Sequence, residues 1–421
     1  MAVAAHTDAP PRTDPPGSPP FQEPASPLAH LSPEQLEELG RELDAIHDEV
    51  FADLGERDSR YIRSTIRLHR HLVLAARALL LHSRSRPLWF AGTASLSVAK
   101  ILENMEIGHN VMHGQWDWMN DPDINSQSWD WDTASPADAW RHSHNYEHHT
   151  FTNIRGLDRD LGYEIMRIDP HQRWHPVYLA QPLYNLLLMG FFEWGVALHD
   201  LNFDALRSGQ KSKAQVMQEL KAIGVKARRQ IVKDYIAFPA LSAAAAAVAS
   251  AVSGRRESRS GRAAWGAFKS TLAADFTANI VRNVWAYSII FCGHFPDQTY
   301  TFSQSEAAEE TRGGFYVRQL TGSANIDGSP LFHLLAGNLS FQVEHHLYPD
   351  MPSSRYAEIA PRVRDVCHCY GLPYNTGPLT RQLGAVHRTI LRLAFPGGRP
   401  RRKPGPYRPE QVSKLTPTPR P

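Results

Sequence analysis

The segment 235–253 reads YIAFPALSAAAAAVASAVS, nineteen residues without a charged side chain. A helix of about 20 apolar residues spans the hydrocarbon core of a bilayer, so this segment has the length and composition of a membrane span. Its alanine run, 243–247, presents small side chains that let a neighbouring helix pack closely in lipid. The segment therefore predicts a membrane-spanning helix and an α-helical membrane fold.

Other apolar segments lie on both sides of this one. We expect 70–83 and 87–105 to form one membrane hairpin, and 235–253 and 268–292 to form a second. The segment 176–198 carries tyrosine and phenylalanine in positions typical of a membrane interface, and we expect it to lie along the surface. The predicted fold is an all-α integral membrane protein with about four membrane-spanning helices.

The distribution of basic residues indicates the orientation of these spans. The stretch 207–233 contains eight lysine or arginine residues, and the positive-inside rule places it in the cytoplasm. With four crossings, both termini lie on that side as well. The histidine clusters described below must face one side in order to share a site, and we expect them in a cytoplasmic helical cap.

The two ends of the chain have a different composition. Residues 1–30 are rich in Pro, Ala and Ser and lack the apolar core of a signal peptide, which predicts a disordered leader. Residues 396–421 are rich in Pro, Gly and Arg and predict a basic disordered tail. Between them, 31–395 is expected to form one domain. Its first helix begins at Ser32, an N-cap with Gln35 as its capping-box partner.

Composition excludes several classes of protein. The 45 lysine and arginine residues nearly balance 43 acidic ones, so no nucleic-acid partner is indicated. The three cysteines, Cys292, Cys367 and Cys369, have no CxxC spacing, which argues against a disulfide framework and against a thiolate zinc site. Histidine is the unusual residue, because 21 is far more than a chain of this size usually carries.

The histidines recur at a fixed spacing beside the apolar segments. His109 and His113 are four apart, so both imidazoles project from one face of a helix. His144 and His148 repeat this spacing, and His149 adds a further imidazole. The remaining members follow the last apolar segments: His294, His345 and His346.

Eight imidazoles are enough for two metal ions. Neutral imidazole binds zinc, copper and iron, whereas one zinc site needs only three or four ligands. Chemistry with O2 requires a metal that changes its oxidation state, which zinc does not. The set therefore indicates a pair of redox-active metal ions, with iron as the expected metal.

These patterns resemble a known family. HxxxH at 109–113, HxxxHH at 144–149 and QxxHH at 342–346 resemble the three histidine boxes of the membrane fatty-acid desaturase and hydroxylase superfamily. The similarity extends over roughly residues 40–390. Longer strings look closest to actinobacterial stearoyl-CoA delta-9 desaturases of the mycobacterial type: 103–122, 233–239, 290–297 and 344–350.

The resemblance implies a di-iron centre with eight histidine ligands: His109, His113, His144, His148, His149, His294, His345 and His346. Gln342 stands where many relatives have a ninth histidine, and its role as a ligand stays open. His142 lies outside the motif and is expected to support the ligands or the fold. Glu106, Glu147 and Glu344 each neighbour a ligand and are expected to orient imidazoles. The other histidines fit no box and are expected to be ordinary surface or helix-end residues: His171, His175, His199, His333, His368 and His387.

The resemblance also implies an activity and its partners. The expected reaction is O2-dependent desaturation of a long-chain acyl chain carried by CoA or by a lipid, at the delta-9 position, on the cytoplasmic face of a bacterial cytoplasmic membrane. The chain has no GxGxxG after a strand and no cysteine set for an iron–sulfur cluster, so a ferredoxin-like donor with its NAD(P)H reductase is expected to supply electrons. The motif at 395–398 resembles the haem motif of cytochrome b5 but lacks its histidine, so neither haem nor flavin is expected.

Two roles are equally compatible with the four tryptophans between the first two boxes. Trp116, Trp118, Trp129 and Trp131 are expected either to line a tunnel for the acyl chain or to form the lid of the domain.

Two other functions fit part of the pattern. A lipid hydroxylase would use the same ligands. A histidine-rich membrane metal transporter would place its ligands inside the spans or in low-complexity loops, and the ordered spacing at helix ends argues against it. The sequence has no HExxH motif for a zinc hydrolase.

Overall fold

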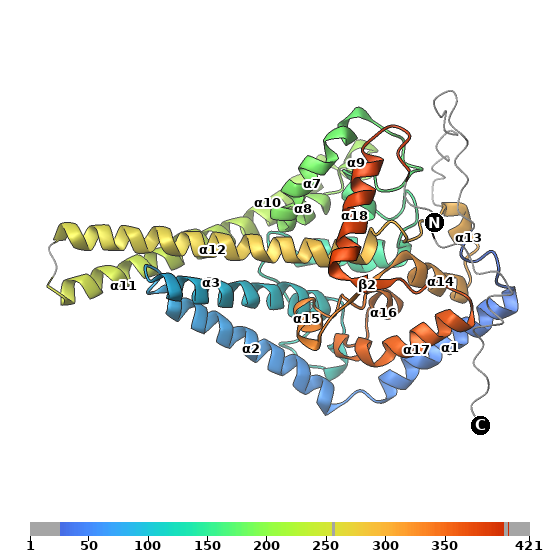
Figure 1. Cartoon of the computed structure of the whole chain (residues 1–421), viewed down its shortest axis with the longest axis horizontal. Coiled ribbons are helices and arrows are strands. Elements are labelled where there is room, and N and C mark those ends of the chain that lie inside the picture. The colour runs from blue at the N-terminus through green and yellow to red at the C-terminus, as the bar shows by residue number, and fades with distance from the viewer. Residues whose placement is uncertain (1–25, 255–256, 400–402, 404–421) are drawn as a thin grey trace.

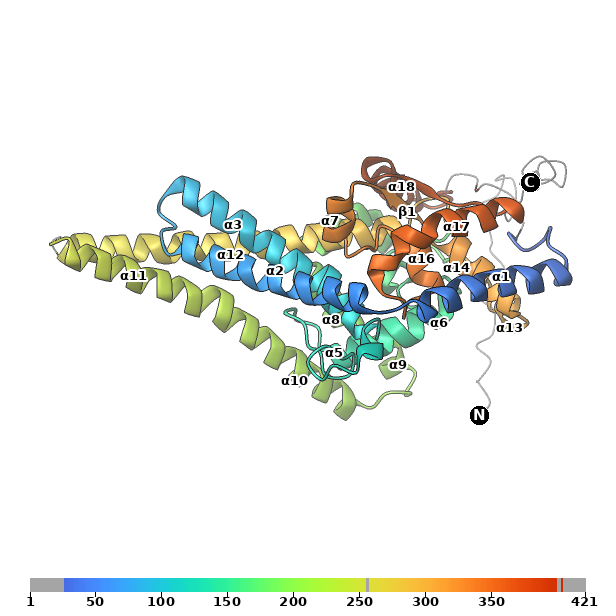
Figure 2. The ribbon, with the colours of Figure 1, turned by 90° about the horizontal axis from the view of Figure 1, so that it is seen from below.

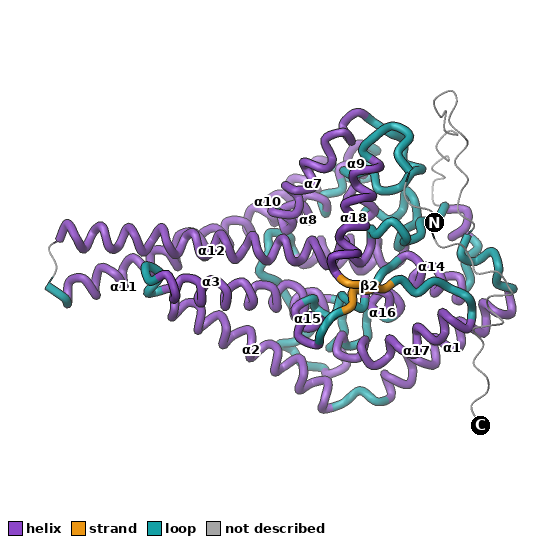
Figure 3. Tube along the Cα trace, in the orientation of Figure 1, coloured by secondary structure: helices purple, strands orange, loops and turns teal. Residues whose placement is uncertain are grey.

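Four long helical segments form an arm that projects from a cap of shorter helices (Figure 1). The computed structural model describes residues 26–254, 257–399 and 403. The leader and tail predicted from composition lie for the most part outside the described residues. Helices dominate the described chain (Figure 3).

The first hairpin of the arm is formed by α2 (Glu56–Leu80) and α3 (Arg86–Ile101). The two helices pack closely at Gly92, because a Cβ atom there would lie only 2.8 Å from Leu80 Cγ. A side chain at this position would therefore push the two helices apart.

The second hairpin is longer than the first. The helices α10 (Lys213–Gln230), η6 (Ile231–Ala237) and α11 (Phe238–Val252) follow one another without a break. The chain returns through α12 (Glu257–His294), whose 38 residues extend about 57 Å at 1.5 Å per residue. Both hairpins occupy the predicted segments, and two of their helices continue several turns toward the cap: α2, which begins at Glu56, and the helix through α10 and η6, which begins at Lys213. The helix α12 extends mainly at the far end of the arm (Figure 1).

The predicted number of four membrane spans stays a prediction. Among the described residues, one continuous helix, Lys213–Val252, is long and apolar enough to cross a bilayer by length and composition. The other long helices carry charged residues, and several of these charges are buried inside the arm. Arg77 Nη1 lies 2.6 Å from Asp275 Oδ1, and Lys100 Nζ lies 2.8 Å from Asp234 Oδ2. These pairs explain how the apolar segments tolerate charged residues.

The predicted surface segment 176–198 is also helical. It consists of η5 (Pro176–Ala180), α7 (Gln181–Gly190) and α8 (Phe192–His199). Its apolar side chains divide between two faces. Three leucines of α7 are mostly exposed, Leu183, Leu186 and Leu187, whereas Phe192 is buried against the arm.

The cap is built on a second apolar core. The helix α1 (Pro33–Ala52) begins with the predicted capping box of Ser32 and Gln35, and Leu39 and Leu43 of this helix are fully buried. They pack against α14 (Arg312–Gly322), α16 (Gln342–Leu347) and α17 (Tyr356–Cys369). One short parallel pair of strands, β1 (Asn325–Asp327) and β2 (Thr376–Pro378), lies beside this core. The remaining elements are η2 (Asp117–Met119), α5 (Ala137–Trp140), α6 (His149–Phe151), η4 (Leu161–Glu164), α9 (Phe203–Arg207), α13 (Gln304–Ala308), α15 (Pro330–Leu335), η7 (Ser353–Arg355) and α18 (Leu379–Leu393).

Two histidine boxes begin in wide, π-helical turns, which the spacing alone did not predict. The first is η1 (Leu102–His109), which continues α3 and leads into α4 (Asn110–Met112). The second is η3 (Arg141–His148). Such turns are rare in proteins and occur frequently at functional sites.

Candidate metal centre

Four parts of the fold bring the predicted histidines together where the arm meets the cap. The end of η1 supplies His109, and His113 follows α4. The end of η3 and the start of α6 supply the second box, the last residue of α12 is His294, and α16 carries the third box. Long helices from the arm thus deliver part of the site, and short helices of the cap deliver the rest.

A first group consists of four histidines, His109, His113, His144 and His345. Each offers one ring nitrogen, and these four atoms lie within 4.8 Å of one another. The Nε2 atoms of His109 and His345 are 3.4 Å apart. Both nitrogens therefore point toward one place, as two ligands of a single ion would.

A second group consists of His148, His294 and His346, whose ligand atoms also lie within 4.8 Å of one another. Gln342 lies beside it, with its Nε2 3.1 Å from His294 Nε2. The Gln342 Oε1 atom is buried and has no hydrogen-bond partner among the described residues. Gly293 makes room for this side chain, because a Cβ there would lie 2.7 Å from Gln342 Cγ.

His149 lies between the two groups. Its ring centroid is 4.7 Å from that of His113 and 4.9 Å from that of His345 in the first group, and it stacks on His346 of the second at 4.5 Å. Both of its ring nitrogens are buried without a hydrogen-bond partner in the described part of the chain. All eight predicted histidines therefore form one continuous cluster.

Hydrogen bonds from outside the cluster fix several rings. The Nδ1 atom of His148 lies 3.0 Å from a carboxylate oxygen of Asp158. His345 Nδ1 lies 3.2 Å from the Tyr356 hydroxyl, and His346 Nδ1 lies 3.1 Å from Gln319 Oε1. Histidines that bind metals are held in this way through the nitrogen that does not bind.

The inner nitrogens of the cluster fit metal ions. Within residues 26–254 and 257–399, the Nε2 atoms of five of these histidines are buried and lack any hydrogen-bond partner: His113, His144, His148, His149 and His346. A buried polar atom without a partner is costly, and a bound metal ion would remove that cost. Neutral nitrogen donors in two groups are suited to two ions of iron, copper or zinc.

The electrostatics of the cluster also favour metal binding. Burial lowers the pKa of six histidines well below the usual value: His109, His113, His149, His294, His345 and His346. Their rings are therefore neutral, the form in which imidazole binds a metal. His148 differs, because burial opposes its protonation but the charge of Asp158 raises its pKa overall.

Two glutamates expected to orient ligands have other partners. Glu106 accepts a hydrogen bond of 2.7 Å from Ser353 Oγ, and Glu344 accepts one of 2.6 Å from the Tyr374 hydroxyl. Adjacent residues of a helix point about 100° apart, so Glu344 turns away from the ligand next to it. Glu106 lies in the wide turn of η1, where side chains three residues apart do not align. Both carboxylates tie the site to the surrounding cap.

The third glutamate and the extra histidine lie at the surface. Glu147 pairs with Arg159 Nη1 at 3.0 Å. The His142 side chain is 69% exposed and stacks on Tyr146. Glu147 was expected to orient a ligand histidine, and in the structure its carboxylate pairs with Arg159.

Asp158, Asp160 and His199 belong to the site but were not predicted. Asp160 Oδ2 lies 3.5 Å from His144 Nδ1, and Asp160 Oδ1 lies 2.9 Å from His199 Nε2. His199, expected to be an ordinary helix-end residue, is buried, and Asp160 raises its pKa against the effect of burial. The sequence did contain a signal for the two acids, because Asp158 and Asp160 lie two residues apart shortly after the second histidine box.

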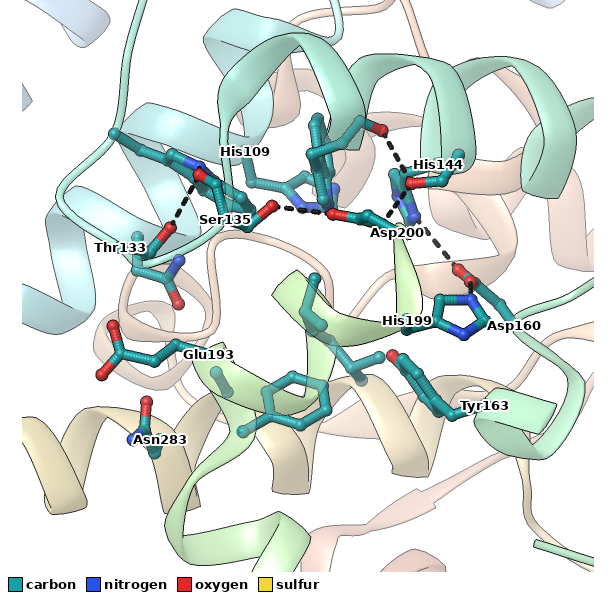
Figure 4. Close-up of a pocket in the computed structure, with 18 of the residues that line it drawn as sticks. His109, Thr133, Ser135, His144, Asp160, Tyr163, Glu193, His199, Asp200 and Asn283 are labelled. Carbon is teal, nitrogen blue, oxygen red and sulfur yellow. Dashed lines mark hydrogen bonds and ion pairs between the residues drawn. The ribbon is translucent and has the colours of Figure 1, made fainter. Parts of the chain in front are cut away.

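A pocket of about 670 Å³, part of it open to solvent, borders the first group. His109 and His144 form part of its wall, and much of the rest is apolar, including Met105, Phe192 and Val196. Figure 4 shows Asp160, His199 and Tyr163 on one side of this pocket, and Thr133, Glu193 and Asn283 on the other. Apolar side chains of this pocket lie beside the first group of histidines, and three carboxylates, Asp160, Glu193 and Asp200, also line it.

Tryptophans contribute to this wall, but not all of the predicted ones. Trp131 lines the pocket, as does Trp140, which was not predicted. The Trp140 ring stacks on His144 at 4.5 Å and lies 5.1 Å from the His109 ring. Trp140 therefore touches both the pocket and the histidine cluster.

The other tryptophans lie elsewhere. Trp116 is fully buried in a separate apolar cluster, where it stacks on Tyr61. Trp129 packs between this cluster and the one that contains Trp131, and Trp118 is partly exposed. For these three the structure favours a role in packing the loop.

Comparison with known proteins gives a consistent result. The family model described as "Fatty acid desaturase" matches residues 87–378. The NADPH-dependent stearoyl-CoA 9-desaturase of Mycobacterium tuberculosis (strain ATCC 25618 / H37Rv) is 45% identical over 369 residues, which cover 88% of this chain and 82% of the relative.

More distant relatives carry related names. The sn-1 linoleoyl-lipid 6-desaturase of Synechocystis sp. (strain ATCC 27184 / PCC 6803 / Kazusa) is 24% identical over 69% of this chain and 76% of its own length. Fatty acid desaturase 3 of Homo sapiens is 29% identical over 26% of this chain and 23% of its own length. No solved structure matches the chain.

Proposed function

The chain belongs to the fatty acid desaturase family and is an oxidoreductase of that family, and on this premise we propose that it inserts a double bond into a long-chain fatty acyl-CoA. The proposed position is delta-9. Both the carrier and the position rest on the mycobacterial relative, whose name specifies stearoyl-CoA and the 9 position.

One observation of the site supports the reaction above all. The largely apolar pocket ends on His109 and His144, two members of the first histidine group. A saturated acyl chain in this pocket would have methylene groups beside the first group of histidines. Trp131 and Trp140 would limit the positions that the chain can take.

The proposed cofactor is a pair of iron ions held by the eight histidines. Bound iron would supply the activation of O2 that removes hydrogen from an unactivated methylene, chemistry that no acid or base of the chain can perform. The side chains of the protein hold the rings in place: Asp158 fixes His148, Tyr356 fixes His345, and Gln319 fixes the imidazole of His346.

The electron balance requires a partner. Reduction of O2 to two water molecules takes four electrons, of which the acyl chain supplies two. We propose that a ferredoxin-like protein and its NAD(P)H reductase supply the other two. The NADPH requirement in the name of the mycobacterial relative supports such a chain of donors.

The proposed location is a bacterial cytoplasmic membrane, with the site on the cytoplasmic face. The apolar helix Lys213–Val252 and the exposed leucines of α7 support contact with lipid. In this arrangement the two hairpins cross the bilayer, and the cap with its histidine cluster stays on the side of the donor proteins.

Expression with a ferredoxin and a reductase in a desaturase-deficient host tests the function. We expect a new monounsaturated fatty acid, located by mass spectrometry at the delta-9 position, and two iron ions per purified chain. A hydroxy acid in its place would identify a hydroxylase. Protein without iron would refute the mechanism.

A matched pair of variants controls this experiment. His148→Ala should abolish the product, because it removes a ligand of the second group. His142→Ala alters an exposed histidine of the same helix and should leave the product unchanged. Equal activity of the two variants would contradict the proposed role of the cluster.

A further inference from the structure

A second pocket lies on the other side of the chain segment that carries Trp131. It has about 920 Å³ of empty space, part of it open to solvent, between the first hairpin and the helix that runs through α10 and η6. Figure 2 shows α10 diverging from α2 as it nears the cap, with the region of α5 between them. The loop 130–133 forms the boundary of this pocket toward the metal centre.

The two pockets share a wall. Trp131 and Thr133 line both of them, so the apolar pocket and the second pocket are separated by one short piece of chain. A long substrate beside the histidine cluster would reach the second pocket by passing this loop. The two spaces differ in chemistry.

The second pocket is rich in positive charge. Five of its lining residues are lysine or arginine, against three that are aspartate or glutamate: Arg77, Lys100, Lys226, Arg229 and Lys233, and Glu103, Asp130 and Asp132. Arg77 and Lys100 are already paired with Asp275 and Asp234. The other three cations project from successive turns of one helix and pair with the loop. An anionic ligand fits this side of the wall better than an apolar one does.

The cations of that helix are held by carboxylates of the same loop. Lys226 Nζ lies 2.5 Å from Asp130 Oδ1 and donates to the Trp131 carbonyl at 2.6 Å, and Lys233 pairs with Asp132. The two aspartates are 42% and 37% exposed, so a ligand can reach them from solvent. A phosphate group offers the same kind of oxygen acceptors with more charge, and it can therefore replace these carboxylates.

Arg229 is the cation that is least committed to the protein. Its side chain is 79% exposed, and its ion pair with Asp130 is long, at 3.8 Å. A guanidinium group presents donors in a planar fork that matches two phosphate oxygens. Arg229 can therefore bind a phosphate without the loss of a strong contact within the protein.

We propose that the second pocket binds the phosphate-bearing end of the acyl substrate, through Lys226, Arg229 and Lys233, while the acyl chain lies in the first pocket. This assignment rests on the proposed function. CoA and a phospholipid head group both carry phosphate esters, and the experiment must tell them apart. The segment around Trp131 then holds the junction between the polar carrier and the apolar chain.

Binding of CoA to the purified full-length protein tests this site directly. Isothermal titration should show affinity for CoA that falls about tenfold in Arg229→Ala, the effect of one lost charge-assisted contact. Arg229→Glu should weaken binding further. Pantetheine, which has no phosphate, should show no difference between the variants.

The matched control is Arg228→Ala. Arg228 is the preceding residue of the same helix and is exposed, but it is not among the residues that line the pocket. This variant loses the same charge and should bind CoA as tightly as the unaltered protein does. Equal weakening by both variants would indicate a general charge effect and would overturn the assignment.

A second ligand distinguishes the two sources of phosphate. If a short-chain phosphatidylglycerol binds in an Arg229-dependent way and CoA does not, the pocket takes a lipid head group. If CoA alone does so, the pocket takes the nucleotide carrier. If neither ligand distinguishes Arg229→Ala from the unaltered protein, the ion pairs serve only to hold the loop, and the assignment is wrong.

Failure of the site and failure of the proposed reaction give different results. Arg229-dependent binding without any unsaturated product would retain the phosphate site and refute the reaction. Unsaturated product with an unchanged KM for stearoyl-CoA in Arg229→Ala would retain the reaction and refute the site. Circular dichroism and iron content of each variant show whether it has folded.

Discussion

The two histidine groups of the cluster differ in their surroundings. The first consists of four imidazoles and borders the apolar pocket through His109 and His144. The second consists of three imidazoles and one amide, Gln342, and is held by the buried carboxylate of Asp158. The comparison indicates that the first group faces the pocket proposed for the acyl chain, whereas a buried carboxylate and an amide surround the second.

The largest expected effect comes from the removal of one ligand from each group. His345→Ala and His346→Ala alter neighbouring residues of α16, one from the first group and one from the second. We expect both variants to lose all detectable product, because each should lose one of two iron ions. Iron analysis and fatty-acid analysis check this. Full iron in either variant would show that the groups are not separate sites.

The next effect concerns the acids that hold the rings. Asp158→Ala should lower iron affinity or activity by about 10- to 100-fold, the usual effect of removing a carboxylate behind a metal-bound histidine. Asp160→Ala should have a smaller effect, because Asp160 lies 3.5 Å from His144 whereas Asp158 lies 3.0 Å from His148. Titration with a chelator ranks the two variants. A larger effect of Asp160→Ala would reverse the comparison.

A smaller effect is expected at the amide of the second group. Gln342→His would give this group a fourth imidazole, and we expect iron retention at least equal to that of the unaltered protein. Gly293→Ala would displace Gln342, because the added Cβ would lie 2.7 Å from its Cγ. That variant should retain less iron in the same chelator titration. Unchanged retention in both variants would exclude Gln342 as a contributor to the site.

The smallest effect is expected at the pocket, where only the first group is involved. Trp131→Ala removes part of the wall and so enlarges the pocket proposed for the acyl chain, while every histidine of the cluster stays unchanged. We expect about a fivefold shift in the preference among chain lengths, at unchanged iron content, because one methylene in an apolar pocket contributes about 1 kcal/mol to discrimination at the low end of its usual range. Product analysis with acyl chains of several lengths checks this, with Trp116→Phe as a control outside the pocket.

The sequence predicted the parts of the site that depend on local spacing. The pairs His109–His113 and His144–His148 could be recognised because residues four apart lie on one side of a helix. Ser32 could be identified as an N-cap for a similar reason, since its partner Gln35 is three residues away. Both kinds of pattern need only a few neighbouring residues.

The parts that could not be predicted depend on contacts between distant segments. His199 meets Asp160 across 39 residues, and Gln319 meets His346 across 27. Trp140 could not be told from other tryptophans until α5 was placed beside the cluster. The number of membrane spans is uncertain from the sequence for a related reason, because charges such as Arg77 find partners only on another helix.

The wide turns of η1 and η3 make the orientation of their histidines sensitive to insertions and deletions. A π-helical turn accommodates one residue more than the α-helix around it, and an ancestor gains or loses it by a single insertion or deletion. Loss of one residue from 102–109 would turn His109 by about 100° relative to α3, although every histidine would remain in the sequence. The position of His109 therefore depends on the length of η1 as well as on the histidine itself, and we expect a variant with intact boxes but one residue fewer in η1 to be inactive.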